Sequence, residues 1–347
     1  MPDSLCPRPT RQQYRLARLI TRWYLDRYHG TDEDVGTASM FCDRRRVGHF
    51  AVSRRALARG SGDALFRMLI ATTMFQRRQD AQILRVLRGI SKEHTYELTD
   101  SRRLLSLADD SRCPHLKSNA TLLEACDLSK DPVTKQGRCG ARPRTPCHLK
   151  QHTVLLKRYG HFGKVPTSVA LTLREGSADS LAELREQVLG EHDDPLERAV
   201  ALERRLSKAW RVSDKISAMF LSAVCNPDLC PGLSPWAEGV DWTRYVVIDS
   251  NVDLFLTGTG YPGPWTYNKR REFIQRLAKR VDLEQMKPGL QRFNPRIVQQ
   301  ALYLFMSISN RRAAKLDCAH EAPRSCEACP GPLKSLCPST ASMSISK

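Results

Sequence analysis

Residues 201–224 read ALERRLSKAWRVSDKISAMFLSAV and residues 246–255 read VVIDSNVDLF, and these two stretches decide the fold. In the first stretch, apolar residues recur at helical spacing on both sides of a short break. The pattern therefore predicts two amphipathic helices joined by a tight turn. Ser213 is placed to cap the second helix, so that Lys215 lies in its first turn. In the second stretch, Asp249 follows three apolar residues.

The chain is strongly basic, with a net charge of +18 over 347 residues. This charge favours a polyanionic partner, because phosphate contacts supply much of the affinity for nucleic acids. A basic soluble protein without such a partner is the alternative. No apolar run approaches the roughly 20 residues of a membrane helix. The first residues, MPDSLCPRPTRQQ, lack the apolar core of a signal peptide. We therefore expect no membrane partner and an intracellular location, in the cytoplasm or nucleoid. The twelve cysteines should then be thiols and metal ligands rather than disulfides.

Helical periodicity recurs along the rest of the chain. Apolar residues follow it at 11–28, at 63–75 and at 269–281. Residues 180–183 form a capping box, and Asn294-Pro295 combines an N-cap with proline at the first helical position. The sequence therefore predicts an all-α protein.

We expect the chain to have three parts. Residues 1–62 form an N-terminal segment that we expect to pack with the C-terminal part. Residues 63–258 form the central region, which contains an insert at 111–160 rich in Gly, Pro, Lys and Arg. Residues 259–338 form a C-terminal helical lobe that ends in a cysteine-rich loop.

A second motif follows the apolar helix of the central region. Residues 66–84 read FRMLIATTMFQRRQDAQIL, in which the helix ends in a polar loop carrying Gln76, Arg77 and Arg78. An amide and two cations at a helix end can hydrogen-bond a base or nearby phosphates. A solvated helix end is the alternative.

Four cysteines near the C-terminus give the strongest metal signal in the chain. Cys318, Cys326, Cys329 and Cys337 are spaced C-x7-C-x2-C-x7-C. Four thiolates at this spacing can bind zinc or a [4Fe–4S] cluster, and spacing alone does not choose between them.

The insert offers a weaker, second zinc site between residues 113 and 152. Its candidate ligands are Cys113, Cys126, Cys139, Cys147, His115, His148 and His152. None of their spacings is a CxxC, so unliganded thiols are an equal alternative.

The hairpin, the lysine just past its turn and the later aspartate resemble the helix-hairpin-helix DNA glycosylase superfamily, of the endonuclease III type. The resemblance covers most of 63–100 and 195–338. It implies two helical lobes, with Lys215 as the residue that attacks the sugar and Asp249 as the essential acid. It also implies that the turn formed by Arg211, Val212 and Ser213 binds a DNA phosphate.

The same resemblance assigns the remaining motifs. Gln76 and Arg77 match a loop that wedges into the duplex beside the extruded base, and Arg78 extends it. The terminal cysteines match a four-cysteine loop that holds a [4Fe–4S] cluster, although its usual spacing is slightly shorter. The family turn is glycine-rich, whereas Arg211 and Ser213 occupy it here. Because non-glycine residues are disfavoured at positive φ, this departure weighs against the standard turn geometry.

The implied function is a DNA glycosylase, with or without AP-lyase activity, that acts as a monomer on duplex DNA with a flipped base. Asp249 would stabilise the charge that develops on the sugar, and Lys215 would be the nucleophile if it is neutral. The inserts at 111–160 and 225–245 can enlarge the pocket for a bulky modified base. A non-catalytic DNA-binding protein and an RNA-modifying enzyme are the alternatives.

Overall fold

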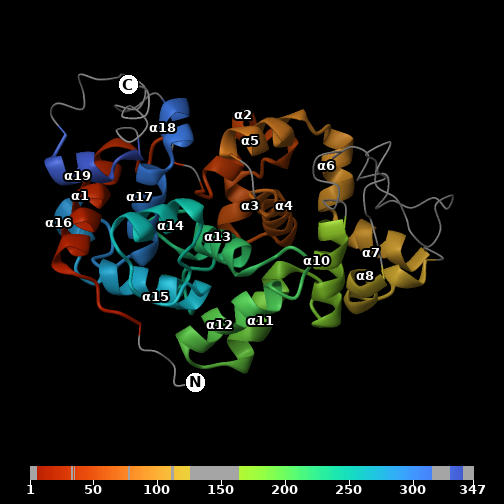
Figure 1. Cartoon of the computed structure of the whole chain (residues 1–347). Helices are drawn as coiled ribbons and strands as arrows, with labels where there is room; N and C mark the ends of the chain where they lie inside the picture. Colours follow the sequence, from red (N-terminus) through yellow and green to blue (C-terminus); the bar gives the residue numbers. More distant parts are fainter. Residues whose placement is uncertain are drawn as a thin grey trace.

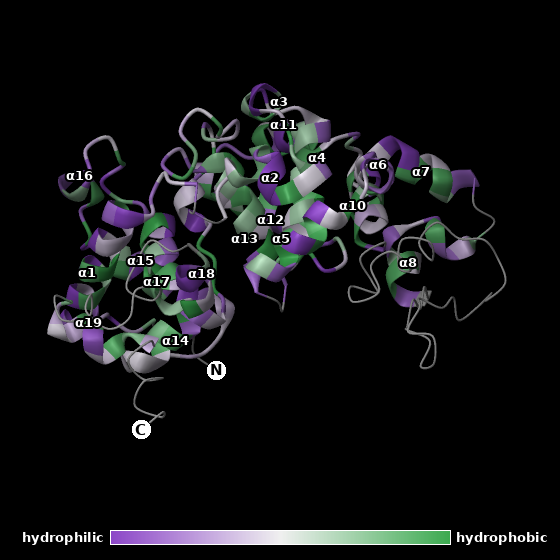
Figure 2. Ribbon diagram, turned by 90° about the horizontal axis from the view of Figure 1, so that it is seen from above, coloured by the Kyte–Doolittle hydropathy of each residue, from purple (hydrophilic) through white to green (hydrophobic). Residues whose placement is uncertain are grey.

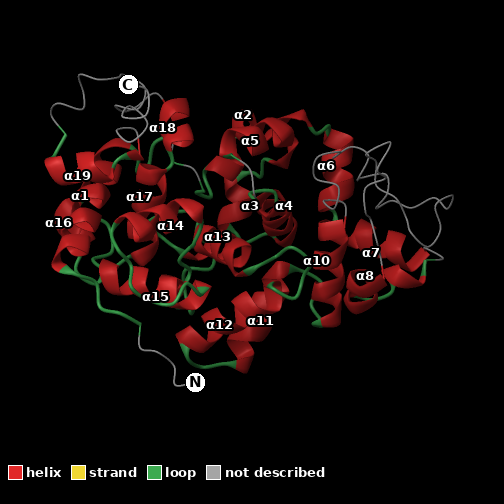
Figure 3. Cartoon of the chain, viewed as in Figure 1, coloured by secondary structure: helices red, strands yellow, loops and turns green. Residues whose placement is uncertain are grey.

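The computed structural model describes residues 6–32, 34, 36–76, 79–110, 113–125, 164–314 and 329–338. In these ranges the chain forms helices and no β-strand (Figure 3). The predicted all-α class is therefore confirmed. None of the helices in the described ranges is long and apolar enough to cross a membrane.

Helix α17 (Pro295–Met306) is the centre of one group of helices, and nearly all of its side chains are buried. Its neighbours are α1 (Arg11–Arg27), α14 (Ser250–Gly258), α15 (Tyr267–Ala278) and α18 (Ile308–Ala314). Helix α1 also contacts α19 (Gly331–Leu336), and α16 (Leu283–Met286) lies in the same group (Figure 1). The first and last helices of the described ranges therefore lie side by side.

Helix α4 (Gly62–Thr73) is the centre of the second group. Its neighbours are α3 (Arg54–Ala58), α6 (Lys92–Thr99), α10 (Lys164–Glu175), α11 (Leu181–Glu191) and α13 (Asp214–Cys225). Helix α12 (Pro195–Leu206) packs on α11 and α13, and α2 (Arg44–Val47) packs on α5 (Asp80–Gly89). Helices α7 (Ser101–Asp110) and α8 (Asn119–Ala125) pack on α10, at the end of the molecule far from α17 (Figure 1). Short 3-10 turns occur at Met40–Cys42, Gly48–Phe50, Pro114–Leu116 and Trp242–Arg244.

Local capping explains where several helices begin. At α1, Thr10 and Gln13 form a reciprocal capping box: the Gln13 N–H donates to Thr10 Oγ1 at 3.2 Å, and the Thr10 N–H donates to Gln13 Oε1 at 2.8 Å. At α11, the Glu183 N–H donates to Ser180 Oγ at 3.2 Å, as predicted. The Glu183 carboxylate, however, accepts from Asp179 rather than from Ser180. Each bond satisfies an N–H group that has no partner within its helix.

One hydrophobic core runs through both helical groups. Figure 2 shows that the helices carry hydrophobic and hydrophilic residues on different faces, as amphipathic helices around a core should. A separate small cluster joins α7, α8 and α10 through Ala108, Leu116, Leu122 and Leu171. Residues 36–61 contain two short helices and two 3-10 turns.

The predicted helical hairpin is present but has a longer connection than expected. Its first helix ends at Leu206, so Trp210 lies in the connection rather than on the helix. The second helix begins at Asp214, with Ser213 as its N-cap. The Ser213 side chain makes no capping hydrogen bond to the described residues. A run of polar and small residues at 207–209 therefore ends the helix earlier than the apolar spacing predicted.

Candidate active site

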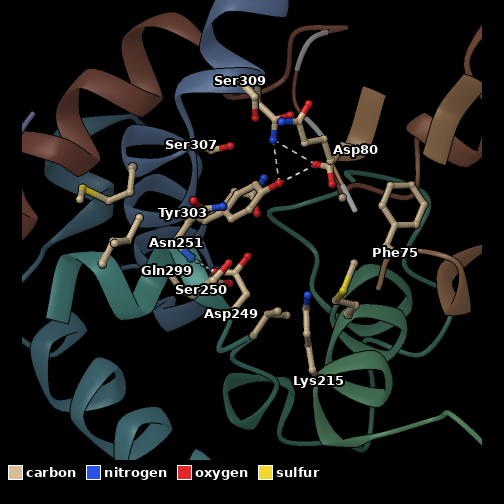
Figure 4. Close-up of a pocket in the computed structure, with 18 of the residues that line it drawn as sticks. Phe75, Asp80, Lys215, Asp249, Ser250, Asn251, Gln299, Tyr303, Ser307 and Ser309 are labelled. Carbon is tan, nitrogen blue, oxygen red and sulfur yellow. Dashed lines mark hydrogen bonds between the residues drawn. The ribbon is translucent and has the colours of Figure 1, made fainter. Parts of the chain in front are cut away.

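A cavity of about 800 Å³ lies where the two helical groups meet. Both predicted catalytic residues, Lys215 and Asp249, line it (Figure 4). The α4–α5 segment and α13 supply Phe75, Asp80, Lys215 and Met219, whereas α14, α17 and α18 supply Asp249, Asn251, Gln299, Tyr303 and Asn310. Residues more than 200 positions apart in the sequence therefore share one cavity.

Asp249 is held rigidly at the start of α14. Its Oδ1 accepts hydrogen bonds from the Asn251 N–H at 3.0 Å and the Val252 N–H at 2.9 Å, so that it caps the helix. The residues before it are buried, and the Tyr267 hydroxyl fixes them by donating to the Val246 carbonyl at 3.1 Å. This explains why an apolar strand-like run precedes the aspartate: the run anchors it in the core.

Burial raises the pKa of Asp249, and the charge of Lys215 and the two backbone N–H groups oppose that shift. The nearby carboxylate of Asp80 raises the pKa of Asp249 further. No ion pair joins Lys215 to either carboxylate within the described part of the chain.

Asp80 is a cavity residue that the sequence analysis did not select. Its Oδ2 accepts hydrogen bonds from the Tyr303 hydroxyl and from Asn310 Nδ2, the latter at 3.0 Å. Burial raises the pKa of Asp80, while those two hydrogen bonds and the charge of Lys215 oppose the shift. Its position within the motif of residues 66–84, directly after the polar loop that carries Gln76, could have identified it. Tyr303 and Asn310 gave no such signal, because the sequence of their helices showed only an apolar pattern.

The hairpin turn lies beside the cavity. Arg211 adopts a φ of 65°, the left-handed conformation for which glycine is usually required. The turn therefore bends at this residue without glycine, contrary to the expectation from its sequence. Arg211 and Ser213 are exposed, whereas Val212 is buried and anchors the turn.

Gln76 connects the α4 end to this turn. Its Nε2 donates to the Arg211 carbonyl at 3.0 Å and to the Thr73 carbonyl at 2.7 Å. Because Phe75 lines the cavity, Gln76 holds the turn next to the cavity. Its predicted contact with DNA stays a prediction, and Arg77 and Arg78 lie outside the described residues.

Two cations flank the indole of Trp210 in the connection. The Lys164 ammonium lies 4.9 Å and the Arg211 guanidinium 5.0 Å from its ring centroid. The backbone N–H of Trp210 donates to Ser168 Oγ at 2.7 Å, which fixes the connection to α10. Cation–π contacts therefore hold Arg211 at the outer surface of the turn.

A buried polar network forms the floor of the cavity. The Arg296 guanidinium donates from Nη1 to Gln299 Oε1 at 2.6 Å and to Gln300 Oε1 at 2.7 Å, and from Nε to Ser222 Oγ at 3.1 Å. Burial lowers the pKa of Arg296, and acidic neighbours, Asp249 among them, oppose that shift. Arg296, Gln299 and Gln300 all line the cavity.

The predicted metal ligands are only partly described. Cys318 and Cys326 lie outside the described residues, as do Cys126, Cys139, Cys147, His148 and His152 of the insert. Among the described residues, no cluster of three or more His, Cys, Asp or Glu side chains could hold a metal ion.

Cys329 and Cys337 flank the short helix α19. Cys337 is buried and accepts a hydrogen bond from Arg311 Nη1 at 3.5 Å. The sequence analysis did not foresee that Arg311 is almost completely buried, with a further hydrogen bond from Nη1 to the Phe305 carbonyl.

The chain matches no family model, no curated protein and no solved structure. Its chemistry therefore follows from the cavity residues themselves. A carboxylate can stabilise a developing positive charge or take a proton from water, and an amine can act as a nucleophile. Apolar side chains such as Phe75 and Met219 give the cavity surfaces on which an aromatic ring can pack.

Proposed function

We propose that this protein is a DNA glycosylase that cleaves the N-glycosidic bond of a damaged or modified base. One observation carries the proposal: Lys215 and Asp249 line the same cavity, beside an exposed hairpin turn. In this proposal the sugar binds between the Lys215 amine and the Asp249 carboxylate. The helix-hairpin-helix architecture with its two lobes belongs to the same proposal.

The hairpin turn would bind a DNA phosphate. Helix α13 follows it, and the first N–H groups of a helix have no intrahelical partner and favour anions. Arg211 and Ser213 are exposed at this end of the helix. Gln76 keeps the turn close to the cavity, so a phosphate bound there would lie near the extruded nucleotide. The strongly basic chain would supply further phosphate contacts.

Asp249 would act on the sugar. Departure of the base leaves positive charge on the sugar ring, and a fixed carboxylate stabilises that charge. Because the helix cap holds Asp249 Oδ1, its other oxygen remains to face the sugar or to take a proton from water. Attack by Lys215 would instead require a neutral amine. We favour attack by water activated by Asp249.

The C-terminal cysteines would hold a [4Fe–4S] cluster, with zinc as the alternative. The surroundings of Cys337 fit a thiolate ligand, because a buried guanidinium donates to its sulfur. Helix α19 separates Cys337 from Cys329 and packs on α1. When bound, the cluster would supply a structural crosslink, so its ligands would stabilise this end of the molecule without entering the reaction.

Release of a free base is the direct test. Duplexes that each carry one defined damaged or hypermodified base would be incubated with the protein, and free base would be measured by mass spectrometry. We expect release from at least one duplex and none with Asp249→Asn. Because a non-catalytic binder would bind DNA without releasing any base, a complete absence of release would contradict the proposal. Competition with folded RNA tests the RNA-modifying alternative.

A further inference from the structure

Gln299 presents only hydrogen-bond donors to the cavity. Gln299 is buried, with 1% of its surface exposed, and it lines the cavity floor. Its Oε1 accepts from Arg296 Nη1 at 2.6 Å, which fixes the orientation of the amide. A flipped amide would set its NH2 group against the guanidinium, donor against donor. Gln299 Nε2 therefore points its hydrogens away from Arg296.

Arg296 adds a second fixed donor beside this amide. Its Nη1 and Nε bind side-chain oxygens of the core, whereas Nη2 has no acceptor among the described residues. Gln299 Nε2 likewise has no acceptor among the described residues. Neither nitrogen is a fully buried polar atom that lacks a hydrogen-bond partner, so each keeps some accessible surface. Since both residues line the cavity, these two nitrogens, which we call the donor wall, open into it.

The position of the donor wall relates it to the reaction centre. Gln299 lies on α17, which packs against α14, the helix that Asp249 caps. Figure 4 shows Gln299 on the same side of the cavity as Asp249 and Asn251. A base whose sugar lies at Asp249 can therefore turn an edge toward the donor wall.

We infer that the donor wall reads the group at position 4 of a pyrimidine or position 6 of a purine in the extruded base, so that the cavity selects an oxo group there, as in uracil and hypoxanthine, over an amino group, as in cytosine and adenine. Glutamine usually reads adenine through its amide oxygen and nitrogen together. Here Arg296 occupies that oxygen. An amino group at the wall would meet donors only, whereas a carbonyl oxygen would satisfy a buried donor. This inference rests on the proposed function for its substrate class, although not for its test.

Binding separates the inference from catalysis. Two pairs of bases differ by an oxo against an amino group and by the proton on the adjacent ring nitrogen: 5-hydroxymethyluracil with 5-hydroxymethylcytosine, and hypoxanthine with adenine. Each base would be placed in a duplex opposite an abasic-site analogue, so that base pairing does not differ. The Asp249→Asn protein, which should leave the base attached, would be titrated with each duplex at fixed salt by fluorescence anisotropy.

We expect the oxo member of at least one pair to bind about tenfold more tightly than the amino member. Gln299→Leu in the same background should reduce this preference to near unity, because it removes the amide and retains the bulk. Gln299→Glu, which replaces the donor with an acceptor, should shift the preference toward the amino member and serves if the leucine variant does not fold. Gln12→Leu, at an exposed position of α1, is the matched control.

Equal or tighter binding of the amino member in both pairs would overturn the inference. So would a preference that neither Gln299 variant changes. If an oxo preference depends on Gln299 but no duplex ever loses its base, the donor wall stands and the glycosylase proposal fails. If a base is released without oxo preference, the glycosylase proposal stands and the donor wall fails.

Discussion

Replacing Asp249 separates its structural task from its chemical one. Its Oδ1 accepts from the N–H groups of Asn251 and Val252, and the amide oxygen of asparagine can accept the same two bonds. Asparagine and aspartate are about equally good N-caps, whereas alanine in their place destabilises a helix by about 1 kcal/mol. Asp249→Asn should therefore keep the start of α14, and Asp249→Ala should lose it.

The pKa shift gives the sign of the stability change. Burial raises the pKa of Asp249 in the folded protein, so its ionised form is less stable there than in the unfolded chain. This unfavourable contribution is absent below the ordinary pKa of aspartate, and it grows as the pH rises through the raised pKa. At pH 7, Asp249→Asn should therefore unfold at the same temperature as the unchanged protein or higher. Asp249→Ala should unfold about 2 °C below Asp249→Asn.

Asp249→Asn should lower the rate of base release, although it should not lower the unfolding temperature. Removing a fixed group that stabilises a developing charge reduces the rate by about 10²- to 10³-fold, equivalent to about 3–4 kcal/mol. Asp249→Asn should reach at least that loss in single-turnover base release, with DNA affinity within about twofold of the unchanged protein. Thermal unfolding and anisotropy on the same preparations provide the controls. Full base release by a folded Asp249→Asn protein would refute the assignment of the carboxylate.

Asp80→Asn should shift the acidic limb of the pH–rate profile to lower pH, because removal of the Asp80 charge lowers the pKa of Asp249; an unmoved limb would show that the two carboxylates do not interact. Arg211→Gly should leave stability nearly unchanged, since it relieves a φ of 65° but loosens the unfolded chain, and it should weaken DNA binding with a salt slope smaller by about 1. Borohydride should trap no protein–DNA adduct if water is the nucleophile, whereas an adduct that Lys215→Ala abolishes would assign the attack to the amine. Purified protein should be brown, with about four irons per chain, and Cys337→Ser should lose the colour; a colourless protein with stoichiometric zinc would favour the alternative metal.

The sequence predicted the elements that rest on local patterns. Period and caps identified the all-α class and the helix that carries Lys215, because these signals lie within a few residues. They did not identify α14, the helix that Asp249 caps. The end of α12 was misplaced because Trp210 continues the apolar spacing but packs in the connection between helices. Arg211 shows the same limit for backbone conformation, since a positive φ held by buried Val212 is set by tertiary packing. The local sequence shows neither the packing of Trp210 nor the positive φ of Arg211.

The donor wall and the second carboxylate were beyond sequence reasoning for a related reason. Asp80, Tyr303 and Asn310 meet only because the two helical groups close on each other, and each residue alone has an ordinary local context. Gln299 becomes a pure donor only because Arg296 takes its oxygen. The cavity thus divides its chemistry between the groups, with Lys215 and Asp80 from one and Asp249 and Gln299 from the other. Hydrogen bonds cross the boundary between the groups: Arg296 Nε donates to Ser222 Oγ at 3.1 Å, and Asp80 accepts from Tyr303 and Asn310. These bonds hold the donor wall and both carboxylates in register across the cavity.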